Sequence, residues 1–445
     1  MALYAFIRTT GSWTVFALLT LLILLTLAAC TDYRSTISAG NDEPSIPEGL
    51  ETLGPIPYPD DNPPVPARIE LGQLLFFDPI LGGERDVSCG TCHHPDLAFA
   101  DGRDLPVGVA GSGLGPERRP GVSAVSGDPV GRTPRNSPTV FNTAFNGGPD
   151  GRPSAHGIQF WDGRRNGLEH QASAPPTSRV EMRGDAYTEE DAIDSVLARL
   201  RAIPEYEARF REAFPEVAAE VDSGLRVSAV DSITYSKALA AYQRELVTRN
   251  SAYDRFVQGD ESALNETQRK GLSLFFGKAR CADCHNGPMF SDYRFVVQGV
   301  PQHGPGKEVL HGDDLGREEH TLDPADRYAF RTPTLRNVAL TAPYMHDGIF
   351  TTLEDVVRFY NDGALPRHPD CTDRMLHPSL RSRLNLSDGE MAALVAFMEA
   401  LTDPGTLLPE TLLRVPERVP SGLPPVFGLG AADPLAEIDM PASGR

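Results

Sequence analysis

Two short cysteine motifs constrain this chain more than any other feature of its sequence. They are Cys89-Gly-Thr-Cys92-His93 and Cys281-Ala-Asp-Cys284-His285, both of the pattern C-x-x-C-H. In an exported protein this pattern is typical of covalent c-type haem attachment, with two thioethers to one haem and the following imidazole on the iron. Zinc sites instead pair C-x-x-C units about 15–20 residues apart, and a redox disulfide needs no histidine. We therefore expect two covalently bound haems, with His93 and His285 as iron ligands.

The N-terminal residues indicate export. Arg8 precedes an apolar run over residues 15–29, which is shorter than the roughly 20 residues of a membrane span and typical of a signal-peptide core. Small residues then precede Cys30, as at the bacterial lipoprotein cleavage site, where the cysteine becomes the lipidated N-terminus. We expect residues 1–29 to be a lipoprotein-type signal peptide. The mature protein would be periplasmic, in the cell envelope, and tethered by a lipid anchor alone; an uncleaved N-terminal anchor is the alternative.

The expected haem motifs and lipid anchor make it possible to interpret the cysteine count, and the net charge bears on the kind of partner. Six cysteines would first suggest disulfides in an exported protein. Four of them belong to the haem motifs and Cys30 to the anchor, so only Cys371 remains and we expect no disulfide. The formal net charge of −20 argues against a nucleic-acid partner, because phosphate binding needs basic patches, and favours a partner with a cationic surface.

A repeated segment precedes each haem motif. Residues 71–79 (LGQLLFFDP) and 270–278 (KGLSLFFGK) both place a glycine three residues before Leu-Phe-Phe. The repetition suggests two related domains, in which Gly72 and Gly271 allow close helix approach and the phenylalanines pack on the haems. Helical periodicity or capping patterns recur near residues 188–200, 226–247, 352–360 and 387–401, without long strand-like alternation. We predict a mainly α, loop-rich fold with two cytochrome c-like haem domains in tandem.

These patterns define an order of segments along the chain. A Pro-rich stretch follows the signal peptide, and a Pro- and Gly-rich stretch ends the chain. We expect a tether at 30–65, an N-terminal haem domain at 66–250, a C-terminal haem domain at 251–403 and a tail at 404–445.

Several further segments carry a family resemblance. They are PRNSPTVFN (134–142), FWDGR (160–164), LEHQA (168–172), VEM (180–182), RTPTLRNVALTAPYMHDG (331–348) and TLEDVVRFYNDG (352–363). With the two haem motifs, they resemble the bacterial dihaem cytochrome c peroxidase and MauG superfamily over roughly residues 66–403. The resemblance implies that the N-terminal haem reacts with peroxide and that the C-terminal haem handles electrons.

The resemblance also implies site residues. Glu181 matches the distal acid–base group, Gln171 and Pro175 match pocket-lining positions, and Trp161 matches the aromatic residue that conducts charge between the haems. A carboxyl group suits such a pocket because burial raises its pKa toward the range in which it can shuttle a proton. Without the motif, Glu181 would be interpreted as a surface carboxylate and Trp161 as core packing.

A calcium ion between the haems is implied in the same way. Asn136 matches its side-chain ligand, and Thr341 and Pro343 match carbonyl ligands. Oxygen ligands suit Ca²⁺, but backbone carbonyls leave no trace in a sequence, so this expectation rests on the resemblance.

Two positions depart from the peroxidase branch. Many peroxidases keep a second histidine that blocks the peroxidatic iron until reduction; here the position is Val109, so we expect a five-coordinate first haem that reacts without prior reduction. Opposite His285, peroxidases have Met, whereas this chain has Tyr360, as in the MauG branch. Core packing of Tyr360 is the alternative, and Met345 is a competing ligand. Phenolate ligation would lower the haem potential, whereas Met/His ligation raises it.

We predict a dihaem c-type peroxidase that reduces hydrogen peroxide to water, with electrons from a small cytochrome or copper protein relayed through the second haem. The alternative is a MauG-like enzyme, in which a peroxide-generated high-valent dihaem oxidises aromatic residues of a partner protein. Ala279 stands where the methylamine-pathway enzyme has a surface Trp as its charge exit, so that enzyme's substrate is not carried over. A dihaem electron carrier is the least favoured hypothesis, because of the pocket formed by Gln171 and Glu181.

Overall fold

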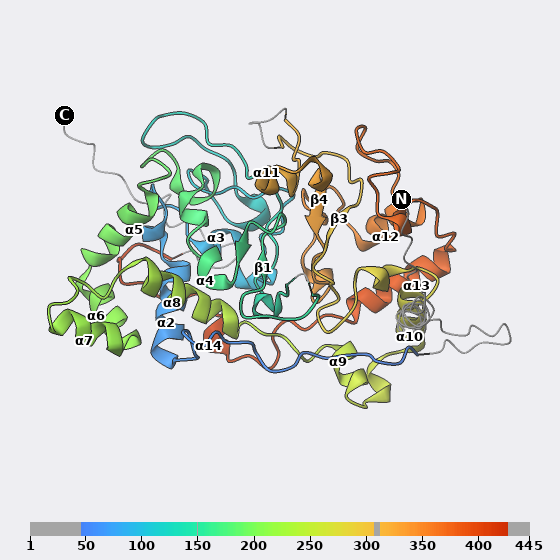
Figure 1. Ribbon diagram of the computed structural model, residues 1–445, viewed down its shortest axis with the longest axis horizontal. Coiled ribbons are helices and arrows are strands. Elements are labelled where there is room, and N and C mark those ends of the chain that lie inside the picture. Colours follow the sequence, from blue (N-terminus) through green and yellow to red (C-terminus); the bar gives the residue numbers. More distant parts are fainter. Residues whose placement is uncertain (1–45, 149, 307–311, 426–445) are drawn as a thin grey trace, which may run out of the picture. The chain divides into compact units, whose positions relative to one another are not determined.

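Helices dominate the fold, as the sequence predicts (Figure 1). The computed structural model describes residues 46–148, 150–306 and 312–425. Among these residues, the only strands form two short antiparallel pairs, β1 (Ile158–Gln159) with β2 (Arg165–Asn166) and β3 (Phe295–Val297) with β4 (Ala329–Arg331). No helix in the described ranges has both the length and the apolar character needed to cross a membrane. The expected signal peptide and Cys30 lie outside the described residues.

Two hydrophobic cores organise the helices. One draws its buried residues from 71–246 and the other from 253–401, so residues 66–250 are called the first half and residues 251–403 the second half. The first half contains α2 (Pro66–Phe77), α3 (Cys89–Cys92), α4 (Leu168–Gln171), α5 (Ala192–Arg201), α6 (Pro204–Ala213), α7 (Pro215–Asp222) and α8 (Ser232–Glu245). The second half contains α9 (Ala252–Val257), α10 (Glu266–Phe276), α11 (Glu318–Thr321), α12 (Leu353–Asn361) and α13 (Asp388–Glu399). The short helix α14 (Glu410–Leu413) follows in the tail.

Local sequence signals account for several of these helices. The apolar face predicted in residues 188–200 becomes the buried face of α5, with Val196, Leu197 and Leu200 inside the first core. The α12 helix begins at Thr352, whose hydroxyl accepts from the backbone N–H of Asp355. The α13 helix begins at Ser387, with a complete capping box to Glu390. Such caps satisfy the backbone N–H groups that a helix start leaves unpaired.

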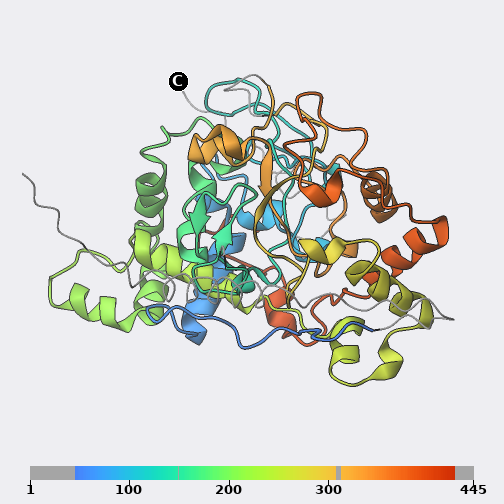
Figure 2. The same cartoon turned by 45° about the vertical axis from the view of Figure 1, so that its right-hand side comes forward.

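The sequence repeat corresponds to a repeated helix pair. In the first half α2 packs on α8, and in the second half α10 packs on α13 (Figures 1 and 2). A Cβ placed on Gly72 would lie 2.0 Å from the carbonyl oxygen of Ala238, and one on Gly271 would lie 1.9 Å from that of Ala393. Both contacts are with backbone, so the expected close approach of helices at these glycines is confirmed.

Replacing Gly271 with Ala is expected to destabilise the protein by about 1–3 kcal/mol or more, because overpacked cores must shift backbone to relieve the clash. A lower midpoint of thermal unfolding would measure the effect. Gly389→Ala is the matched control, since a Cβ there meets nothing within 4 Å. Equal midpoints for Gly271→Ala and the wild-type protein would contradict the close helix contact.

The described end of the expected tether is part of the fold. Leu53 is buried, the Tyr58 hydroxyl donates to Glu245 at 2.6 Å, and the Asn62 amide donates to Glu169 at 2.7 Å. These contacts pair residues more than 100 positions apart, which composition cannot reveal. Residues 53–62, within the expected tether, therefore pack on the fold.

Residues 404–425 of the expected tail also pack on the fold. Their apolar side chains Leu408, Leu412, Leu413, Val415 and Leu423 lie against the first core. The Gln73 amide donates to the carbonyl of Thr411 at 2.6 Å, and the Ser421 hydroxyl donates to the buried Asp78 carboxylate at 2.6 Å. The tail thus covers the outer side of α2, although it follows the second half in the sequence.

Candidate active site

One cavity of about 1240 Å³ receives side chains from both halves. This volume exceeds the ~300–1,000 Å³ of a pocket for one drug-sized ligand. Nearly all residues singled out from the sequence line it: Cys89, Cys92, His93, Asn136, Trp161, Gln171, Pro175, Glu181, Cys281, His285, Thr341, Pro343 and Tyr360. Cys284 belongs to the same motif as Cys281 but does not line the cavity. None of the five cysteines in the described ranges forms a disulfide.

The first imidazole is held in one orientation. His93 follows α3, which begins at a capping box on Ser88. Its Nδ1 lies 3.1 Å from the carbonyl oxygen of Phe99, an atom that can only accept, so Nδ1 carries the proton. Burial lowers the pKa of His93 and keeps the ring neutral. The lone pair of Nε2 is therefore free for a metal, the arrangement that metal-binding histidines adopt.

The second motif repeats this arrangement. The Nδ1 of His285 lies 2.9 Å from the carbonyl oxygen of Phe290, and burial lowers the pKa of this imidazole as well. Each half thus brings thiol and imidazole groups to a cavity with aromatic lining from Phe76 or Phe275: Cys89, Cys92 and His93 in the first half, and Cys281 and His285 in the second. These residues fit a haem in each half.

Glu181 lies in a single π-helical turn, η6 (Arg179–Arg183). Such turns are rare and occur often at functional sites. The carbonyl oxygen of Glu181 accepts from the backbone N–H of Val109 at 2.9 Å, and Gly108 lies so close that a Cβ there would be 2.1 Å from the same oxygen. Val109 therefore helps to hold the Glu181 turn. Gln171 ends α4 and Pro175 begins the turn η5 (Pro175–Thr177).

Trp161 makes hydrogen bonds through both its indole N–H and its backbone carbonyl. Its indole N–H donates to the carbonyl of Asn136 at 3.0 Å, and its own carbonyl accepts from the N–H of Arg331 at 2.7 Å. The N–H of Asn136 donates to the carbonyl of His346 at 2.7 Å. Asn136 therefore connects the indole to a loop of the second half.

Asn136 is also the expected calcium ligand. Its amide nitrogen donates to the carbonyl of Arg103 at 2.8 Å, so its amide oxygen is the atom left for a cation. The described residues contain no cluster of three or more His, Cys, Asp or Glu side chains that could hold a metal. A cation beside Asn136, Thr341 and Pro343 would depend on neutral amide and carbonyl oxygens, which Ca²⁺ accepts.

Tyr360 projects from the last turn of α12 into the cavity. Its hydroxyl lies 4.0 Å from the sulfur of Met345, which lines the same cavity. Burial raises the pKa of Tyr360, with a further contribution from the Cys284 and Cys281 thiols, and Tyr360 lines the same cavity as Cys281 and His285. The two candidate axial ligands therefore lie side by side.

Comparisons with known proteins identify the family. A family model described as di-haem cytochrome c peroxidase matches residues 66–262. The cytochrome-c peroxidase IdrP1 of Pseudomonas sp. (strain SCT) is 32% identical over 84% of this chain and 91% of its own length. The methylamine utilization protein MauG of Methylorubrum extorquens is 36% identical over 78% of this chain and 81% of its own.

The chain belongs to the dihaem cytochrome c peroxidase and MauG superfamily. It is an oxidoreductase of the cytochrome c peroxidase type. Solved structures support the fold: a MauG-like protein associated with microbial copper homeostasis aligns with a TM-score of 0.64 at 29% identity, over 84% of this chain and all of that one. The diheme peroxidase BthA from Burkholderia thailandensis aligns with a TM-score of 0.58 at 24% identity, over 77% of this chain and 87% of its own, which shows the fold alone.

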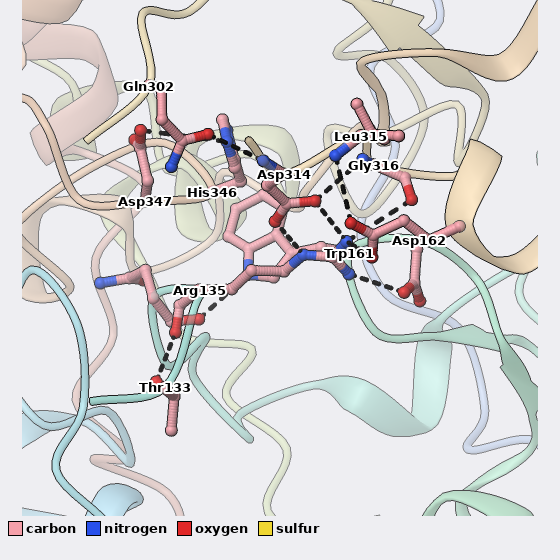
Figure 3. A network of polar contacts seen from close by, with 12 residues as sticks. Thr133, Arg135, Trp161, Asp162, Gln302, Asp314, Leu315, Gly316, His346 and Asp347 are labelled. Atoms are coloured by element: carbon pink, nitrogen blue, oxygen red, sulfur yellow. Dashed lines mark hydrogen bonds and ion pairs between the residues drawn. The ribbon is translucent and has the colours of Figure 1, made fainter. Parts of the chain in front are cut away.

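A buried ionic cluster beside Trp161 was not predicted from the sequence of this dihaem peroxidase (Figure 3). The Arg135 guanidinium contacts Asp162 at 2.6 Å, Asp314 at 2.5 Å and Glu319 at 3.3 Å. All four side chains are buried or nearly so. Arg135 and Asp162 belong to the quoted segments PRNSPTVFN and FWDGR, so charged residues within buried family motifs were the available signal. Asp314 and Glu319 lie outside the quoted segments, so no signal in the sequence pointed to them.

Proposed function

We propose that this protein reduces hydrogen peroxide to water, with electrons that enter at a second haem and reach the first. The supporting observation is that one cavity brings together His93, Glu181, Trp161 and His285. When bound, the two haems supply iron redox chemistry, held by the thiols of Cys89 and Cys92 in one half and of Cys281 and Cys284 in the other. Residues 66–250 and 251–403 would each form a cytochrome c-like domain around one haem.

Glu181 would move a proton within bound peroxide. Its carboxylate accepts the proton from one peroxide oxygen and returns it to the other, which then leaves as water. Gln171 donates a hydrogen bond that orients the peroxide, and Pro175 limits the space around it. Two electrons and two protons convert one hydrogen peroxide into two water molecules. The attachment of the Glu181 turn to Val109 keeps the carboxylate at a fixed place in the cavity.

Trp161 would conduct charge between the halves. Its indole N–H is bonded to a backbone carbonyl, which cannot accept the indole proton. The ring therefore keeps its proton while charge passes, and the transfer needs no coupled proton movement at this residue.

A MauG-like function is the second candidate, favoured by Tyr360 in the cavity beside the second haem motif. In that case equivalents derived from peroxide would be withdrawn from aromatic residues of a partner protein. Ala279 is buried and offers no charge exit, so such a partner would differ from that of the methylamine-pathway enzyme.

Three further proposals concern a calcium ion, the lipid anchor and the electron donor. Asn136, Thr341 and Pro343 would bind Ca²⁺. Residues 1–29 would be removed and Cys30 lipidated, which places the enzyme at a membrane of the cell envelope, in the periplasm. The acidic chain would recognise a small cytochrome or copper protein with a basic face, because complementary charge accelerates encounter.

Direct mixing of the oxidised enzyme with peroxide and reduced cytochrome c tests the function. We expect turnover without a lag at about 10²–10³ per second, within the ordinary range for enzymes, and a high-spin ferric signal in the electron paramagnetic resonance spectrum, because Val109 cannot ligate the first haem. Slow turnover with a long-lived oxidised state would support the MauG-like function instead. A purely low-spin spectrum together with a need for prior reduction would contradict the open first haem.

A further inference from the structure

Arg135 closes a ring of contacts around Trp161. Arg135 is bonded through the chain to Asn136, whose carbonyl accepts the indole N–H at 3.0 Å. Trp161 is bonded through the chain to Asp162, whose carboxylate contacts the Arg135 guanidinium at 2.6 Å. Two peptide linkages, one hydrogen bond and one ion pair thus form a closed loop that contains the indole (Figure 3).

The same guanidinium binds the second half. Its Nε and Nη2 contact the two carboxylate oxygens of Asp314 at 2.5 and 2.7 Å, and Nη2 also contacts Glu319 at 3.3 Å. Asp314 is itself fixed, because its N–H donates to Gln302 and its carboxylate accepts from the N–H of Gly316. The ring around Trp161 is therefore anchored to a segment 179 residues away from Arg135 in sequence.

Only an arginine side chain can make this set of contacts. Its planar fork presents donors in two directions, so one group binds Asp314 bidentately and Asp162 from another edge. A lysine ammonium is a single point charge and cannot span both carboxylates. Arg135 is 7% exposed and lies over the ring of Phe330, 5.4 Å from its centroid. Little water can therefore replace a lost contact.

We propose that Arg135 is the positioning residue for charge transfer through Trp161. It holds the indole in place within the first half and, through Asp314, links that position to the second half. The proposal rests on the conducting role of Trp161 in the proposed function. It assigns to Arg135 a function beyond that of an ion pair that stabilises the fold.

The test compares Arg135→Lys and Asp162→Asn with Arg68→Lys. Arg68 is equally buried but lies away from the cavity, where it contacts Asn62 at 2.9 Å, so its substitution measures the general cost of losing a buried arginine. Asp162→Asn removes the charge that Arg135 and Arg164 both contact while it keeps the Arg135–Asp314 fork, and it decides the question if Arg135→Lys does not fold. Trp13 lies within residues 1–29, which the proposed processing removes, so Trp161 is the only tryptophan of the mature protein.

Two measurements are made on the haem-loaded protein. Ultraviolet resonance Raman spectroscopy reports the hydrogen bond of the indole N–H; we expect its band to shift toward a weaker bond in both ring variants and not in Arg68→Lys. Stopped-flow spectroscopy follows the spread of the peroxide response from one haem to the other. We expect this step to slow by at least about tenfold in the ring variants, since small misplacements have large effects on rate.

Wild-type Raman bands and rates in the ring variants would overturn the proposal. So would an equal loss in Arg68→Lys, which would reduce the role of Arg135 to general stability. If the wild-type protein shows no peroxide response, the proposed function fails, while the Raman bands still decide whether Arg135 positions the indole.

Discussion

Replacing Glu181 with Gln is expected to lower kcat for peroxide reduction by about 10²- to 10⁴-fold, the usual contribution of a positioned general acid–base group. Glutamine has the same size and can still form hydrogen bonds, but its amide cannot accept a proton and return it. Steady-state oxidation of reduced cytochrome c by peroxide measures the loss. Unchanged haem absorption would show that the site is assembled in the variant.

Glu190→Gln is the matched control for this experiment. Glu190 is exposed, follows the Glu181 turn by a few residues and does not line the cavity. We expect it to retain wild-type turnover. Full activity in Glu181→Gln would refute the assigned role and would direct attention to other proton-carrying groups at the cavity wall.

Replacing Tyr360 with Met is expected to raise the reduction potential of the second haem by on the order of 100 mV, because a phenolate stabilises ferric iron whereas a thioether favours ferrous iron. The same change should improve electron uptake from a cytochrome donor and shorten the lifetime of any oxidised state. A spectroscopic redox titration of the purified holoenzyme measures the potential of each haem.

Met345→Leu separates the two candidate ligands. The Met345 sulfur lies 4.0 Å from the Tyr360 hydroxyl, so either side chain can serve the same haem face. If Tyr360 is the ligand, Met345→Leu leaves the potential close to wild type. A lower potential in Met345→Leu, together with no change in Tyr360→Met, would show that methionine is the ligand and that this enzyme resembles the peroxidase branch at its second haem.

Local signals in the sequence predicted much of the scaffold. Helix starts at Thr352 and Ser387 follow from side chains that cap the first turn, and the contacts at Gly72 and Gly271 follow from the repeated segment. The gathering of His93, Glu181 and Trp161 at one cavity was implied by family resemblance, since nothing in their spacing alone requires it. The π-helical turn that presents Glu181 was not predicted, and its contact with Val109 joins residues 72 positions apart.

Contacts across long sequence separations could not be predicted. Arg135 and Asp314 are 179 residues apart, and neither residue type indicates a partner at that distance. The packing of Leu53 and Tyr58 on the fold could not be predicted either, because Pro-rich composition is equally compatible with a free tether and with a segment bound to the surface. Composition reports how a segment behaves in isolation, whereas these contacts depend on the surfaces that the rest of the chain presents.

The packing of residues 404–425 on the first core has a consequence for the order in which the chain folds. Gln73 contacts Thr411 across 338 residues and Asp78 contacts Ser421 across 343, so these contacts can form only after almost the whole chain has been synthesised. The buried residues of the second core all come from residues 253–401, and Leu50 packs against them. Contacts of such long range form late in folding. Until residues 404–425 have been made, the side of α2 that they contact is therefore left exposed to solvent.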